Sequence, residues 1–180
     1  MTALHPSPYA AALLREWEHE ALNTQMVLES LPEKWYPWKP SAKSRGLFDL
    51  AAHIADNVSL IPHVLETNGV DLATFTYPET KVNNRNEMLQ LFQDNQQLAG
   101  KALQAVPSNE VWNETWTMRT GEAIHFVRTR KLTLRTMALN HILHHRGQLI
   151  VYLRLLNEKV PGLYGPSKDE ELAMQAAAGV

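Results

Sequence analysis

Four long segments with helical spacing of their apolar residues constrain the fold of this chain more than any other feature. In each segment, apolar side chains recur every three or four positions and therefore share one face of a helix. These segments cover residues of about 9–30, 45–67, 84–106 and 131–157. Ser44 is the expected N-cap of the second helix, and Pro62 predicts a kink near His63 or an early end. Four amphipathic helices predict an all-α fold, a four-helix bundle, with connections long enough that at least one crosses over.

The segments between the predicted helices carry turn residues and one alternating stretch. Residues 32–44 hold three prolines and three aromatic residues and predict an ordered loop, and residues 70–82 predict another loop. Apolar and polar residues alternate over 111–117 and 123–128, which favours a short hairpin between the third and fourth helices. Residues 169–175 predict a short final helix or a frayed end.

Composition excludes several classes of function. The chain has 180 residues, 17 basic and 19 acidic side chains and a net charge of −2, which offers no basic excess for a nucleic-acid backbone. No apolar run is long enough to cross a membrane, and the first residues do not resemble a signal peptide, so we expect a cytoplasmic protein. Residues 1–180 are expected to form one domain, with its core over about 9–165. The absence of cysteine excludes thiolate chemistry and zinc–thiolate sites, so any metal ligands must be nitrogen or oxygen.

Three of the eight histidines lie on apolar helix faces. His141 and His145 are one turn apart, about 40° around the helix, on the stripe that also carries Leu149. His53 lies in the middle of the apolar stripe of the second helix. Three neutral imidazoles can bind a divalent metal ion and leave a coordination position open, which is the arrangement of catalytic sites. The alternative interpretation is that they are hydrogen-bonded core histidines.

Two sequence motifs resemble the DinB-like family, also called DinB/YfiT-like, of metal-binding four-helix bundles. The run 140–149, NHILHHRGQL, is similar to the C-terminal signature of that family, and 47–55, LFDLAAHIA, is similar to its second helix. The resemblance covers about residues 9–164. It implies up-down-down-up connectivity, His53, His141 and His145 as ligands of zinc or nickel, and a homodimer. Characterised relatives include transferases and isomerases that use a low-molecular-weight thiol such as bacillithiol or mycothiol.

A metal site of this kind predicts hydrolysis or thiol transfer to an electrophilic small molecule, since the metal lowers the pKa of a bound water or external thiol. Asn57, Gln148 and Tyr152 lie on the metal-facing arcs and are candidate substrate-binding residues; alternatively, they satisfy one another at the edge of the core. A second hypothesis for the whole protein is a non-catalytic, metal-stabilised dimeric binding module. No nucleic acid or membrane is expected as a partner.

Two charged residues near the predicted ligands have competing interpretations. Asp49 precedes His53 by one turn and could accept its second ring proton, or it could simply be favoured by the helix dipole in the first turn. Arg146 lies about 140° from His141 around the helix, which predicts a salt bridge that faces solvent or a partner.

Overall fold

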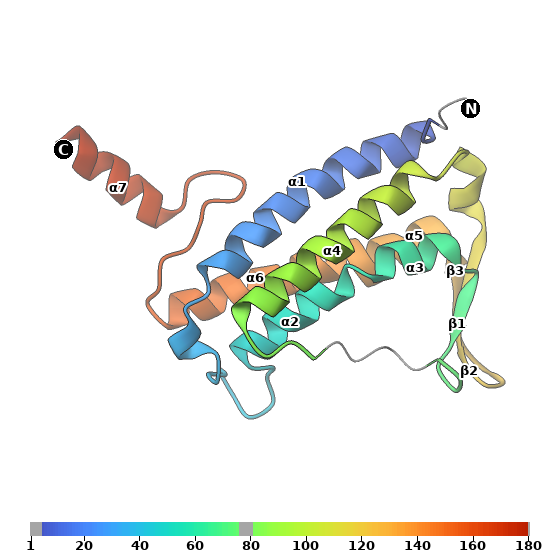
Figure 1. The fold of residues 1–180 in the computed structure, drawn as a ribbon, viewed down its shortest axis with the longest axis horizontal. Helices are drawn as coiled ribbons and strands as arrows, with labels where there is room; N and C mark the ends of the chain where they lie inside the picture. The colour runs from blue at the N-terminus through green and yellow to red at the C-terminus, as the bar shows by residue number, and fades with distance from the viewer. Residues whose placement is uncertain (1–4, 76–80, 180) are drawn as a thin grey trace.

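The computed structural model describes residues 5–75 and 81–179, and its long helices form a bundle (Figure 1). The helices are α1 Pro8–Ser30, α2 Leu47–Asn57, α3 Leu60–Glu66, α4 Arg85–Gln104, α5 Arg130–Leu134, α6 Asn140–Leu155 and α7 Lys168–Ala178. Both α1 and α2 pack against α4 and α6. In Figure 1, α1 and α6 run in one direction, and α2 and α4 run in the other.

The core of the bundle consists of the apolar stripes that the helical spacing predicts. Trp17 of α1, Ile54 of α2, Phe92 of α4 and Leu149 of α6 are each at most 1% exposed. Large apolar side chains of this kind dominate the free energy of burial, at roughly 1.5–3 kcal/mol each. The bundle therefore positions the faces of α2 and α6 that carry the histidines.

A three-stranded sheet at one end of the bundle makes the predicted all-α class wrong. The strands are β1 Gly69–Asp71, β2 Thr115–Thr120 and β3 Ala123–Thr129. Strands β2 and β3 form the expected hairpin, while β1 pairs with β2 in parallel, Gly69 opposite Thr117. Strand β1 lies in the segment predicted as a loop, of which residues 76–80 are outside the described part of the chain. Three residues are too few to show a strand period, and their partner strand is distant in sequence.

The buried side chain of Arg130 fixes this sheet against the end of α3. Its guanidinium donates to the carbonyl oxygens of Leu65 and Thr67, at 3.0 and 2.6 Å, and pairs with Glu114 at 2.8 Å. A basic side chain that satisfies the last carbonyls of a helix is a common C-terminal cap. Because Arg130 directly follows β3, this cap fixes the sheet beside α3.

Two predicted helices contain interruptions. The second helix divides into α2 and α3 at Val58 and Ser59, which is the early end that Pro62 predicted as the alternative to a kink near His63. The ring of a proline clashes with the carbonyl group four residues earlier, which here is that of Val58. The N-cap of α2 is Gly46, not Ser44.

The predicted fourth helix contains a π-helical turn, Arg135–Leu139, between α5 and α6. The last helix, α7, extends away from the bundle (Figure 1). No helix of the described chain is long and apolar enough to span a membrane.

Candidate metal centre

Three histidines from two helices meet where α2 packs against α6. His53 lies in α2, and His141 and His145 lie one turn apart in α6. One nitrogen of each ring lies within 4.8 Å of a nitrogen of the other two. The Nε2 atom of His141 is 3.4 Å from that of His53 and 2.7 Å from that of His145. The fold therefore brings together the three side chains predicted as metal ligands, each of them partly buried.

Hydrogen bonds on the outer side of two rings determine which nitrogen carries the proton. Nδ1 of His145 lies 2.8 Å from Oε1 of Gln148, and because an amide oxygen only accepts, Nδ1 is the donor. A hydrogen bond to the carbonyl oxygen of Met137 opposes the lowering of the pKa of His141. In the neutral ring of His145, Nε2 then carries a lone pair, and it faces Nε2 of His141 across 2.7 Å. Ring nitrogens oriented in this way by hydrogen bonds on their outer side are typical of metal ligands.

The π-helical turn before His141 provides the carbonyl group in this arrangement. Within the turn, the N–H of Asn140 donates to the carbonyl of Arg135, five residues back. The carbonyl of Met137 accepts from Nδ2 of Asn57, at 3.3 Å, as well as from His141. Single π-helical turns are frequent at functional sites, and this one links α2 to the orientation of a candidate ligand.

Burial keeps the three imidazoles neutral. Desolvation, and then the positive charge of Arg45, lower the pKa of His53 from 6.5 to about 4. Burial is also the main reason why the pKa of His141 and that of His145 are lowered, although the hydrogen bonds to Met137 and Gln148 oppose the shift. A metal ligand must be a neutral imidazole, so this environment favours the form that binds metal.

An apolar cavity of about 320 Å³ extends from His53 along α2 and α3 to the sheet. Its polar lining residues are His53, Asp56, Asn57 and His63. Its apolar lining residues are Leu60, Val70, Leu72, Phe75, Trp116, Met118 and Met137. Because Val70 belongs to β1 and Trp116 and Met118 belong to β2, one wall of the cavity combines the expected hairpin with the strand that sequence analysis missed.

His63 is a residue of this cavity that sequence analysis did not select. Its Nε2 atom is buried and has no hydrogen-bond partner among the described residues. The ring lies 5.2 Å from that of Phe75 and 6.1 Å from that of Trp116, measured between centroids. Burial lowers the pKa of His63, although Glu66 opposes the shift. The spacing 53, 56, 60, 63 on one helical face is the sequence signal that could have identified this residue.

The three candidate substrate-binding residues have different surroundings. Asn57 lines the cavity, and Gln148 holds His145. The hydroxyl of Tyr152 donates to the carbonyl of Arg45, at 3.4 Å, and its ring packs edge-on against Trp38. Tyr152 is therefore part of the packing between α6 and the aromatic loop and does not belong to the cavity lining.

Asp49 lies at the surface and not behind His53. Its side chain is exposed and lies beside Gly46, and among the described residues it makes no hydrogen bond to His53. It stands in the first turn of α2, which agrees with the helix-dipole interpretation. His144 is also exposed, with its ring centroid 5.1 Å from that of His145.

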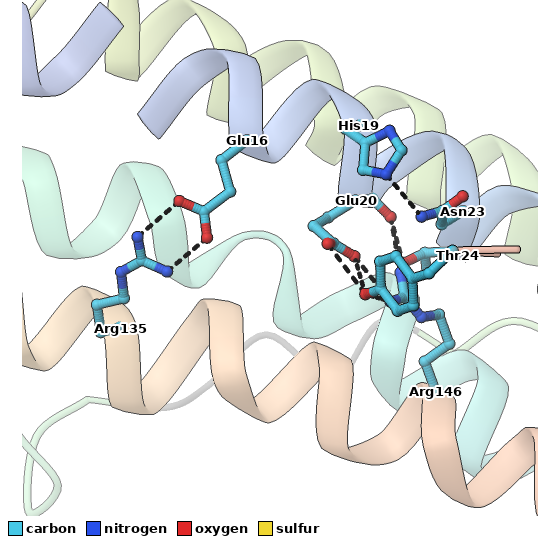
Figure 2. Close-up of polar contacts among 8 residues, drawn as sticks. Glu16, His19, Glu20, Asn23, Thr24, Arg135 and Arg146 are labelled. Carbon is cyan, nitrogen blue, oxygen red and sulfur yellow. Dashed lines mark hydrogen bonds and ion pairs between the residues drawn. The ribbon is translucent and has the colours of Figure 1, made fainter. Parts of the chain in front are cut away.

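Arg146 forms the predicted salt bridge, but the expectation that it faces solvent is wrong. Its side chain is 3% exposed and pairs with Glu20 of α1 at 2.7 Å. It also donates to Oγ1 of Thr24 at 3.1 Å and to the hydroxyl of Tyr164. Figure 2 shows this cluster on the side of α6 that packs against α1. A bundle helix has two neighbours, so a residue 140° from the α2-facing side still points at another helix.

Comparisons with known proteins give a consistent assignment. A family model described as "DinB family" matches residues 5–175. The chain is 29% identical over 160 residues to the "Uncharacterized protein YrdA" of Bacillus subtilis (strain 168), an alignment that covers 87% of this chain and 89% of that protein.

Solved structures of DinB-like proteins share the fold. One from Bacillus subtilis (YjoA) has a TM-score of 0.64 at 17% identity and covers 86% of this chain and 98% of its own. One from Bacillus cereus ATCC 10987 has a TM-score of 0.64 at 21% identity, over 84% and 95% of the two chains.

Proposed function

This chain belongs to the DinB family, and from that premise we propose that it is a metal-dependent enzyme whose His53, His141 and His145 hold a divalent ion, zinc or nickel. The observation that carries the proposal is the convergence of three histidine nitrogens, one of them from His53, which lines an apolar cavity. All-nitrogen ligand sets of this kind suit both metals.

One of the two Nε2 spacings already matches a tetrahedral ion, and the other, 2.7 Å between His141 and His145, must lengthen when an ion binds. Two nitrogens at about 2.0–2.1 Å from a tetrahedral zinc lie about 3.4 Å apart, and the Nε2 atoms of His53 and His141 are 3.4 Å apart. Within residues 5–75 and 81–179, no fourth histidine, cysteine or carboxylate joins the group. Three protein ligands leave a position for water or substrate, which distinguishes catalytic from structural zinc sites.

The bound ion would supply a Lewis acid that lowers the pKa of water or of a thiol toward neutral. The protein residues orient and enclose this site. Gln148 and the carbonyl of Met137 hold the rings of His145 and His141 in the ligand tautomer, and the cavity walls exclude water from an electrophilic substrate. We expect hydrolysis or thiol transfer, and because the chain has no cysteine, any thiol must arrive as a small cosubstrate.

A non-catalytic, metal-stabilised homodimer is the alternative. The two functions differ in what lies beside the ion, since a structural site needs no cavity for a ligand. The cavity that reaches His53 therefore favours the enzyme. We expect a homodimer in either case, which sedimentation analysis would test.

Metal content and thermal stability test the proposal. Protein purified without a nickel column should contain about one zinc or nickel ion per chain. At free metal of 100 times the dissociation constant, binding should stabilise the fold by about 2.7 kcal/mol. His53→Ala should abolish both effects, and His144→Ala, which removes an exposed histidine of the same helix, should change neither.

If His53→Ala binds metal as the wild type does, the proposed site is wrong.

Activity is the second test. Metal-loaded wild-type protein should be assayed against electrophiles with a panel of low-molecular-weight thiols and with water alone. Loss of activity in His53→Ala, but not in His144→Ala, is the expected result.

A further inference from the structure

The cavity beside the three-histidine site, called the groove below, is lined by two histidines, His53 of α2 and His63 of α3. Asn57 and Leu60, which lie between them in the sequence, line it as well. A ligand in the groove would therefore have both His53 and His63 among its neighbours.

The walls of the groove select an apolar body. Trp116 and Met118 come from β2, and Trp116 is 1% exposed. The indole N–H of Trp116 donates to Oγ1 of Thr67 at 3.1 Å, so this wall is fixed to the end of α3. Ligand pockets generally combine apolar walls with a few polar groups that fix orientation.

His63 is the polar lining residue with an unused hydrogen-bonding atom among the described residues. The polar neighbours nearer to His53 already have partners: Asp56 has one, and the amide of Asn57 donates to Met137. By contrast, Nε2 of His63 is buried without a hydrogen bond. Buried polar groups in proteins are almost always hydrogen-bonded, so an exception needs an explanation. The His63 side chain lines the groove together with Phe75 and Trp116, so a ligand in the groove would contact it.

We propose that this groove is the substrate subsite of the three-histidine centre and takes a small molecule with an apolar body and one hydroxyl or carbonyl group, which His63 binds. The role of the groove as a substrate subsite rests on the proposed function. The binding of a small molecule in the groove does not depend on that function. The neutral imidazole can donate to a carbonyl or accept from a hydroxyl.

Two simple probes distinguish the contribution of the apolar walls to binding from that of the hydrogen bond to His63. Toluene and 4-methylphenol have nearly the same body, and only the second carries a hydroxyl. Chemical shifts of ¹³C-labelled methionine methyl groups report the site directly, because Met118 and Met137 line the groove and Met26 and Met174, which lie outside its lining, serve as internal references. The titrations should be carried out on protein as purified, with and without added Zn²⁺.

Both probes should shift the signals of Met118 and Met137 and leave the references unchanged. In the wild type, 4-methylphenol should bind about fivefold more tightly than toluene, as expected for one hydrogen bond. In His63→Leu the ratio should fall to about one while toluene still binds. In His63→Gln, whose amide nitrogen can take the place of Nε2, the preference should return.

A measurement on the wild type keeps the inference testable if His63→Leu does not fold. The ¹⁵N shift of His63 Nε2 should move with 4-methylphenol and not with toluene. An unchanged ¹⁵N shift, an unchanged ratio in His63→Leu, or no shift of Met118 and Met137 would each overturn the inference. If the probes bind and no metal does, only the proposed function fails; if metal binds and the probes do not, only this inference fails.

Discussion

Two arginine–glutamate pairs join α1 to the chain segment that ends in α6, and they should differ sharply in their contribution to stability. Arg146 and Glu20 are 3% and 12% exposed, whereas Arg135 and Glu16 are 32% and 40% exposed (Figure 2). Both pairs have close contacts, at 2.7 and 2.6 Å. The difference in burial is therefore the main variable between them.

Arg146→Met should cost about 3–5 kcal/mol of unfolding free energy, because it leaves the largely buried carboxylate of Glu20 without its cation. It also removes the donors to Thr24 and to the carbonyl of Glu20, at 3.1 Å each. Arg135→Met is the matched control, and it should cost about 0.2–1 kcal/mol, as exposed pairs do even with good geometry.

Urea denaturation at pH 7, followed by circular dichroism, measures both costs. A third variant, Glu20→Leu combined with Arg146→Met, removes both charges and should recover most of the stability lost in Arg146→Met. The reasoning is refuted if Arg146→Met costs no more than Arg135→Met, or if the double variant is less stable than Arg146→Met alone.

Three further predictions concern the sheet and the three-histidine site. Gly69→Ala should destabilise the fold by about 1–3 kcal/mol in thermal denaturation, because its Cβ would lie 2.3 Å from the carbonyl oxygen of Thr117; an unchanged melting temperature would contradict this close approach. Gln148→Ala should weaken metal binding about 10–100-fold, measured by competition with a chelator, since it frees the ring of His145; equal affinity would exclude the orienting role. The metal-free protein should lose about 2 kcal/mol as the pH falls from 6.5 to about 4, because the unfolded chain protonates His53 at 6.5 and the folded chain only at about 4; a difference in unfolding free energy between wild type and His53→Ala that stays constant with pH would contradict the predicted pH dependence.

Helical periodicity predicted the elements of the bundle because it depends on neighbours three and four residues away. It also placed His141 and His145 on one face, since one turn of helix separates them whatever surrounds the helix. Local signals failed where the helix was not regular. The π-helical turn Arg135–Leu139 shifts the phase of the residues before His141, and the break at Val58–Ser59 separates His63 from the helix of His53.

The meeting of His53 with the α6 pair, the burial of Arg146 and the apolar cavity depend on contacts between elements. The parallel pairing of β1 with β2 places Gly69 opposite Thr117. A strand of three residues is too short to show an alternating pattern from which the sequence could predict it. The sequence by itself therefore determined the helices, the absence of thiol ligands and the candidate histidines. Only the tertiary structure decided which helix faces which and where the sheet lies, because these depend on packing between residues far apart in the chain.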